Sequence, residues 1–175
     1  MSQENEKQKP NMALVYGSLL ARLWLAVRAI QTGIEKYAGI SVATKPVNIA
    51  GQPNDYGLVA ATPVKEYGFS HYHGVPQALY KKFEAEPLMT DFALKIYDAI
   101  LGPALILLGL SILVGFAYRS SLMLLGLLYI SLTWGLILIK QDAGVAWLGV
   151  HMILVVMALM LAEHNRLSVP VLKKW

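Results

Sequence analysis

The sequence predicts an all-α fold, a four-helix transmembrane bundle with a long extracytoplasmic loop between helices 1 and 2. Two runs of 20 residues, Ala99 to Tyr118 and Ser120 to Ile139, contain no Asp, Glu, Lys or Arg, and in a third run, Ala143 to Ala162, His151 is the only ionisable side chain. About 20 apolar residues in a helix match a hydrocarbon core of roughly 30 Å. The composition, 56% hydrophobic and 15% charged, also fits a small polytopic membrane protein in a lipid bilayer.

The N-terminal part predicts a tail and a first span. Residues 1–11 are polar and too short to fold, which indicates a flexible tail. Residues 12–37 form an apolar segment that also carries Arg22, Arg28, Glu35 and Lys36. A lipid-facing Arg at mid-bilayer costs about 3 kcal/mol, so we expect Arg22 and Arg28 to face the bundle. Arg22 is expected to pair with an acidic group, with Asp98 as the first choice.

Residues 38–90 form one long connection that is rich in Pro, Gly and aromatic residues. No helical or strand periodicity persists in it until Pro76 to Glu86, which predicts a short helix on the surface. A loop of this length is usually functional or disordered, and its aromatic content favours ordered packing over a membrane face.

The remaining spans are predicted at residues 91–118, 120–140 and 143–163. The connections between them are short, which makes neighbouring helices antiparallel. Asp91, Lys95 and Asp98 fall at spacings of four and three and form one polar face where the second helix enters the membrane. Residues 12–175 are therefore expected to form a single membrane domain.

The cations predict an orientation. Lys7, Lys9, Arg119, Arg166, Lys173 and Lys174 would lie at the end that holds both termini, whereas the opposite short turn has Lys140 offset by Asp142. By the positive-inside rule both termini are cytoplasmic, and the long loop faces the outside or periplasm. We expect the protein to lie in the cytoplasmic membrane of a prokaryote.

Composition excludes several kinds of chemistry. The chain has no cysteine, which removes disulfides, thiol nucleophiles and iron–sulfur clusters held by cysteine. The net charge of +4 is small and dispersed, so nucleic acid is not an expected partner. Because no phosphate-loop, nucleophile-elbow or HExxH motif is present, any redox role needs a bound cofactor or a partner subunit.

His151 lies inside a predicted span, where an imidazole needs a partner. It either donates to a quinone carbonyl or moves a proton, or it serves as a hydrogen-bonding contact between helices. A haem is not expected, because His164 lies 13 residues further along the same helix and cannot supply a second axial ligand at the same depth.

His71 and His73 are candidates for a metal site in the loop. On an extended strand, residues two apart point the same way, so both imidazoles would lie on one face. No third ligand is fixed by the sequence, and hydrogen bonding within the loop is the more common role of such histidines, so we do not expect a bound metal.

Three segments resemble the DoxX/DoxD-like family of four-helix membrane proteins. In LARLWLAVRAIQTGIEKY the family's first-helix pattern is matched by Arg22-Leu23, Gly33, Lys36 and Tyr37. YDAILGPALILLGLSILVGF is similar to the second helix, with Asp98 where Glu is more usual, and HMILVVMALMLAEHNRLSV resembles the fourth helix and its tail. The chain departs from the pattern at Ala26, where many members carry Gly, and in its longer loop.

The resemblance implies a membrane subunit of a quinone-linked oxidoreductase, similar to subunits of thiosulfate:quinone oxidoreductase. On this hypothesis a quinone binds near Arg22, Lys36, Asp98, Trp134 and His151, and the loop supports the site or docks another membrane or periplasmic subunit. Arg22 or Lys36 would stabilise negative charge on oxygen, and Asp98 or His151 would handle a proton. The alternative is an accessory subunit of a larger membrane assembly without chemistry of its own.

Overall fold

The computed structural model describes residues 11–49 and 51–165. Most of the predicted tail (1–11) and the cations Lys7, Lys9, Arg166, Lys173 and Lys174 lie outside them. The elements in order are α1 (Met12–Glu35), β1 (Ala38–Pro46), β2 (Asn48–Ile49), β3 (Gln52–Pro53), β4 (Val59–Tyr67), the 3₁₀ turn η1 (Phe69–His71), α2 (Gln77–Glu84), α3 (Asp91–Val114), α4 (Tyr118–Leu138), α5 (Asp142–Met160) and the 3₁₀ turn η2 (Ala162–His164).

Within the described residues, four helices are long and apolar enough to cross a membrane: α1, α3, α4 and α5. Their bounds lie within four residues of the predicted spans. The prediction of four membrane-spanning helices is confirmed at this level, and it indicates an integral membrane protein in a lipid bilayer.

Local sequence explains where these helices begin and end. The side chain of Asn11 accepts a hydrogen bond from the Ala13 N–H at the start of α1, and Thr90 does the same for Ala93 at the start of α3. Gly115, with φ of 80°, ends α3 in the left-handed conformation that glycine adopts without strain. Residues 115–117 then turn the chain into α4, and residues 139–141 turn it into α5.

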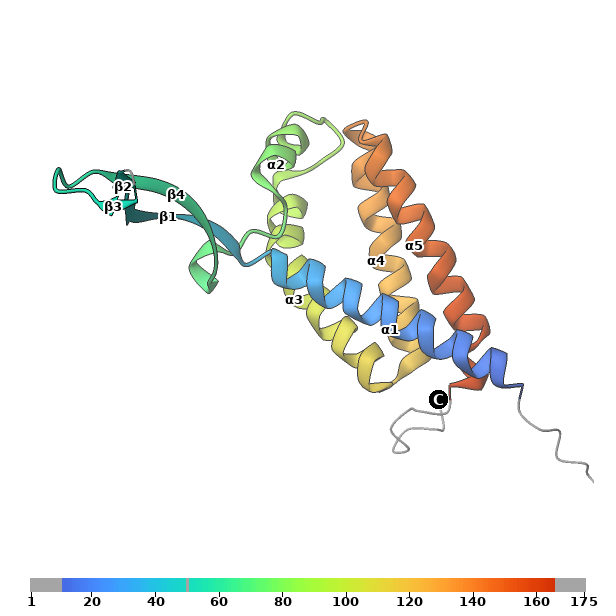
Figure 1. Cartoon of the computed structure of the whole chain (residues 1–175). Coiled ribbons are helices and arrows are strands. Elements are labelled where there is room, and N and C mark those ends of the chain that lie inside the picture. Colours follow the sequence, from blue (N-terminus) through green and yellow to red (C-terminus); the bar gives the residue numbers. More distant parts are fainter. Residues whose placement is uncertain (1–10, 50, 166–175) are drawn as a thin grey trace, which may run out of the picture.

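The two short turns place the elements at two ends of the bundle. The start of α1, the α3–α4 turn and the end of α5 lie at one end, which we call the terminal end. The β-strands, α2 and the α4–α5 turn lie toward the other, which we call the loop end (Figure 1).

Helix α1 packs closely against α3. A Cβ on Gly33 would lie 3.0 Å from the carbonyl oxygen of Gly102, and a Cβ on Gly109 would lie 3.0 Å from that of Ala26. Small residues therefore let the two backbones approach, as in other membrane helix pairs. The fully buried side chains of the core come from all four long helices: Leu25, Leu105, Ile112, Leu122, Leu125 and Val155.

The all-α prediction is wrong for the first part of the loop. Strands β1 and β4 form an antiparallel hairpin, paired from Ala38 with Tyr67 to Pro46 with Val59, and β2 and β3 pair beyond it. The hairpin projects away from the helices (Figure 1), and every residue of β4 is exposed. Because neither face is buried, no alternation of apolar and polar residues appears in the sequence. The short helix predicted at Pro76 to Glu86 is confirmed as α2.

Helices α3 and α4 meet at their shared turn and separate toward the loop end, where α2 lies (Figure 1). Phe83 of α2 and Leu94 of α3 form a small buried cluster there with Val75 and Ile139, apart from the main core. The second half of the loop, with α2, therefore packs against the long helices. The candidate site lies beside this contact.

Candidate functional site

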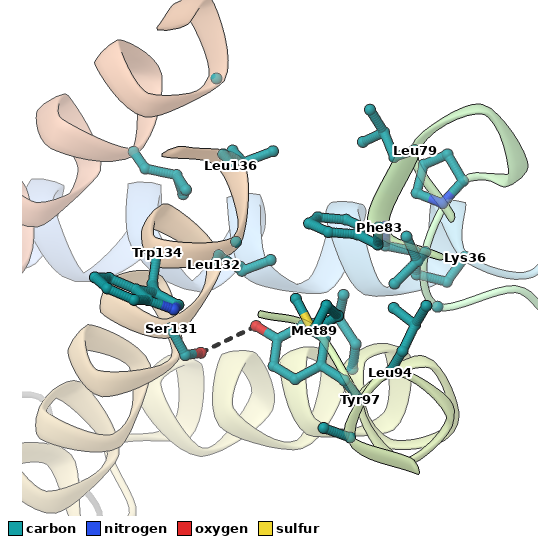
Figure 2. Close-up of a pocket in the computed structure, with 18 residues that line it drawn as sticks. Lys36, Leu79, Phe83, Met89, Leu94, Tyr97, Ser131, Leu132, Trp134 and Leu136 are labelled. Carbon is teal, nitrogen blue, oxygen red and sulfur yellow. Dashed lines mark hydrogen bonds between the residues drawn. The ribbon is translucent and has the colours of Figure 1, made fainter. Parts of the chain in front are cut away.

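A cavity of about 370 Å³ lies between α2, the first half of α3 and the second half of α4. We call it the helix cavity. Figure 2 shows Phe83 and Leu94 on one side of it and Trp134 and Leu132 on the other. Its lining residues are Lys36, Gly74, Val75, Pro76, Leu79, Phe83, Met89, Ala93, Leu94, Tyr97, Leu101, Ser131, Leu132, Trp134, Gly135, Leu136, Gly144 and Leu148.

Lys36 is the cationic residue of this lining, and it follows the last residue of α1. Burial lowers the pKa of the Lys36 ammonium below its ordinary value, and the nearby charge of Asp98 acts in the opposite direction. A partly desolvated ammonium interacts more strongly with an acceptor than one in water. Lys36 is therefore suited to bind a carbonyl or anionic oxygen of a ligand.

Tyr97 and Ser131 form a polar contact across the cavity wall, with 3.0 Å between their hydroxyl oxygens (Figure 2). The Ser131 hydroxyl also lies 2.8 Å from the carbonyl oxygen of Leu128, to which it donates. A serine hydroxyl has one proton, so Tyr97 is the donor to Ser131. This bond joins α3 to α4 where the two helices separate.

Residues 74–76, at the end of the loop segment that runs along α3, form part of the cavity wall. The Val75 N–H donates to the Asp98 carboxylate over 2.6 Å, and the His73 N–H donates to the Lys36 carbonyl over 2.8 Å. Gly74 packs on the backbone of α3 so closely that a Cβ there would collide with the carbonyl oxygen of Asp98. Asp98 thus positions the loop that carries Gly74, Val75 and Pro76 into the cavity wall.

Arg22 lies outside the helix cavity, at the C-terminal end of α3. Its Nε donates to the carbonyl oxygen of Ile112 over 2.9 Å, and one terminal nitrogen lies 2.5 Å from that of Leu113. The other terminal nitrogen donates to Asn165 over 2.9 Å. The prediction that Arg22 faces the bundle is confirmed, since only 4% of it is exposed. The same prediction is wrong for Arg28, which is exposed and donates to Gln31 of its own helix.

The predicted pairing of Arg22 with Asp98 is wrong. Asp98 is in the second turn of α3, whereas Arg22 binds carbonyls of its last turn, about 20 Å further along the helix. Those carbonyls lie at the C-terminal, negative end of the helix dipole, and that of Ile112 also accepts from the Gly115 N–H over 3.2 Å. Arg22 therefore neutralises a helix terminus, a role that residue type and spacing alone do not reveal.

His151 also lies outside the helix cavity. Its Nδ1 is 2.8 Å from the carbonyl oxygen of Trp147, one turn earlier in α5, and its ring packs edge-on against Tyr129. The Nε2 atom is buried without a hydrogen-bond partner among the described residues. The imidazole borders a separate groove of about 260 Å³ between α1 and α5, with Trp24, Val27, Arg28, Gln31 and Trp147.

The extended strand expected for His71 and His73 is not formed. His71 ends the 3₁₀ turn η1, and Nδ1 of His73 lies 2.8 Å from the carbonyl oxygen of His71. That contact is the loop hydrogen bonding named as the alternative role. Across residues 11–49 and 51–165 no group of three or more His, Asp or Glu side chains is arranged to hold a metal ion.

The structure thus brings Lys36 and Trp134 together in one cavity, with Asp98 directly behind its wall. It also adds Tyr97, Ser131 and Phe83, which the sequence reasoning missed. Tyr97 and Ser131 could have been found as polar side chains inside apolar spans. The position of Phe83 depends on how the loop packs against the helices, which the sequence does not give. Comparison with models of known protein families, with curated proteins and with solved structures finds no match to this chain.

Proposed function

We propose that this protein binds a lipophilic ring compound of the quinone class in the helix cavity, as a membrane subunit of a quinone-linked redox assembly. The observation that carries the proposal is an apolar cavity between membrane-spanning helices with Lys36 in its lining. The resemblance to DoxX/DoxD-like proteins favours the same ligand, and membership of that family is part of the proposal.

The cavity fits such a ligand in size and character. Its volume of about 370 Å³ lies at the lower end of the range typical of small-molecule sites. Leucine, phenylalanine and tryptophan side chains provide flat and aliphatic contact surface for a ring. A quinone head group also needs few polar partners, and the cavity offers Lys36 together with the Tyr97 and Ser131 pair.

Each polar residue has a definable task toward a ring carbonyl. Lys36 donates to a carbonyl oxygen and stabilises negative charge that develops there on reduction. Tyr97 is a further donor at the α3 and α4 wall when it releases Ser131. When bound, a quinone supplies two-electron, two-proton redox chemistry, and the electrons come from a partner protein because the chain has no cysteine to hold a cluster.

The β-hairpin favours a second candidate function, the accessory subunit. Both faces of the hairpin and both of its edges are open, and a two-stranded hairpin alone is marginally stable in water. Apolar side chains such as Ile40 and Val42 are largely exposed on it. This surface is suited to bind a partner subunit. Such binding is compatible both with an accessory subunit and with a subunit that binds a quinone.

Orientation is part of the proposal. On the side of the termini the sequence carries Lys7, Lys9, Arg119, Arg166, Lys173 and Lys174, whereas the short turn between α4 and α5 carries Lys140 and Asp142. The positive-inside rule then places the terminal end in the cytoplasm and the hairpin outside, in the periplasm of a prokaryotic cell.

The test is to purify the protein in mild detergent, extract its lipids and measure quinone per folded molecule. Lys36→Met should lower quinone occupancy about tenfold, the effect of losing about 1.4 kcal/mol. Lys95→Met, which removes an exposed cation of α3 outside the cavity, is the matched control and should not change it. Leu132→Trp should lower occupancy by filling the cavity while Lys36 remains. Wild-type protein without quinone, or equal occupancy in all variants, would contradict the proposal.

A further inference from the structure

A second hollow of about 340 Å³ runs along the outside of α4 and α5, and we call it the α4–α5 groove. Its lining residues are Tyr129, Ile130, Thr133, Trp134, Ile137, Val145, Leu148, Gly149 and Met152. Ile130, Trp134 and Ile137 are each more than half exposed, so this face of α4 is open to the surrounding lipid. The groove lies within the membrane-spanning part of both helices.

The groove adjoins the helix cavity. Trp134 and Leu148 line both hollows, one residue from each helix. The indole of Trp134 and the side chain of Leu148 therefore lie between the helix cavity and the α4–α5 groove.

The groove is suited to hydrocarbon. Thr133 donates its hydroxyl to the carbonyl oxygen of Tyr129 over 2.8 Å, so the donor of this residue is already engaged. The lining from Ile130 to Ile137 spans two turns of α4, about 10 Å along the helix. A Cβ added at Gly149 would meet no atom within 4 Å, which shows that the space beside this residue is open.

We propose that the α4–α5 groove is a tail subsite, and that the ligand of this protein is a head-and-tail amphiphile. Its ring lies in the helix cavity, and its isoprenoid chain passes Trp134 and Leu148 to lie in the groove. This inference rests on the proposed function, because it takes the ring to be bound in the helix cavity. A ring with a long apolar tail then binds more tightly than the same ring alone, since the groove adds van der Waals contacts along the tail.

The test compares two probes, a quinone without a tail and the same quinone with a polyprenyl tail, in binding assays on full-length protein in detergent. The matched variants are Gly149→Phe, whose Cβ would meet no atom within 4 Å and whose ring would occupy the groove, and Val150→Phe, which adds the same side chain at the neighbouring exposed position outside it. Gly149→Phe should weaken binding of the tailed quinone about tenfold and leave the tailless quinone unchanged. Val150→Phe should change neither, and Gly149→Leu provides a smaller filling residue with the same expected direction.

The outcomes separate this inference from the proposed function. Tailed and tailless quinones that bind equally to wild type, or tailed binding that Gly149→Phe and Gly149→Leu leave unchanged, would overturn the tail subsite while the ring site stands. A wild-type protein that binds neither probe would overturn the ring site, and the tail subsite with it.

Discussion

The hydroxyl of Tyr72 contacts the backbone of α3 at the turn where Pro103 has no N–H to donate. In a regular helix, the N–H of residue 103 would donate to the carbonyl oxygen of Ala99, but proline has none. The Tyr72 oxygen lies 2.9 Å from that carbonyl oxygen and 2.6 Å from that of Asp98, so its single proton is shared between the two, and it accepts from the Gly102 N–H over 3.3 Å. A loop residue thus completes a membrane helix, which explains how segment 68–75 is held at the helix cavity.

The first prediction tests this relationship with a double-mutant cycle. Tyr72→Phe should destabilise the protein by about 1 to 2 kcal/mol, because it removes the hydroxyl that contacts the Asp98 and Ala99 carbonyl oxygens and the Gly102 N–H of α3. Pro103→Ala restores an N–H for the Ala99 carbonyl, so the cost of Tyr72→Phe should fall by at least about 0.5 kcal/mol in that background. Thermal or denaturant unfolding in detergent measures both. Strictly additive effects would show that the hydroxyl does not replace the missing donor.

The second prediction concerns pH. Burial raises the pKa of Tyr72 above its ordinary value of 10.0. A group whose pKa is raised in the folded state contributes stability that is complete below the unfolded pKa and is lost as pH rises through the folded one. The stability difference between wild type and Tyr72→Phe should therefore be constant below about pH 10 and should narrow above it. A difference that narrows already at neutral pH would contradict the assignment.

The third prediction compares two arginines of α1. Arg22→Met should destabilise the protein by at least about 2 kcal/mol, because the carbonyls of Ile112 and Leu113 lose a charged donor. Arg28, which is exposed and bonded to Gln31 one turn later, is the matched control. Arg28→Met should change stability by no more than about 0.5 kcal/mol. Equal effects of the two substitutions in unfolding experiments would remove the special role of Arg22.

The fourth prediction uses two glycines with opposite surroundings. Gly74→Ala should cost about 1 to 3 kcal/mol, since its Cβ would collide with the backbone of α3 at Asp98. The Cβ of Gly149→Ala, in the middle of α5, would have no atom within 4 Å. This substitution should leave stability unchanged or raise it by up to about 1 kcal/mol, because alanine has the higher helix propensity. Melting temperatures of the two variants provide the measurement. A tolerated Gly74→Ala would mean that segment 68–75 does not lie directly on α3.

The fifth prediction removes the imidazole of His151. Because His151 lines the α1–α5 groove and not the helix cavity, His151→Leu should leave quinone per folded molecule unchanged while Lys36→Met lowers it. The measurement is the same lipid extraction. A loss of quinone in His151→Leu without loss of folded protein would return the imidazole to the ligand site.

The sixth prediction is the topology. Since the chain has no cysteine, single cysteines report on accessibility without background. A cysteine in place of Tyr56, at the exposed outer part of the hairpin, should react with an impermeant thiol reagent in sealed cells. A cysteine in place of Ser120, at the terminal end, should react only after the membrane is opened. The reverse pattern would invert the proposed orientation.

The helices were predictable because span length and the absence of charge depend on local sequence alone. The bounds of α1 and α3 at Met12 and Asp91 agree with the predicted starts, and the caps Asn11 and Thr90 give the reason. The β-hairpin was not predictable by the same means, because strands exposed on both faces need no apolar alternation. Its proline residues fit this setting, since both strands are edges of a two-stranded sheet.

The candidate site was predictable only in part. Lys36 and Trp134 could be named as polar or aromatic residues at membrane depth, yet their shared cavity depends on how α3 and α4 separate and on where α2 lies. Arg22 was expected to pair with Asp98 because both are charged residues of membrane helices, but the packing of α1 on α3 brings Arg22 to the opposite end of α3 from Asp98. Tyr72 carried no sequence signal beyond being aromatic, and its role follows from Pro103, which lies 31 residues away.

The position of Arg22 also sets an order of events during biosynthesis. Its acceptor at Ile112 is 90 residues later in the chain. At ordinary elongation rates the ribosome needs roughly 5 to 20 seconds to synthesise that interval. During this time the carbonyl oxygens of α3 that bind Arg22 in the folded protein have not yet been made. This contact between α1 and α3 therefore forms only after α3 has followed α1 into the membrane.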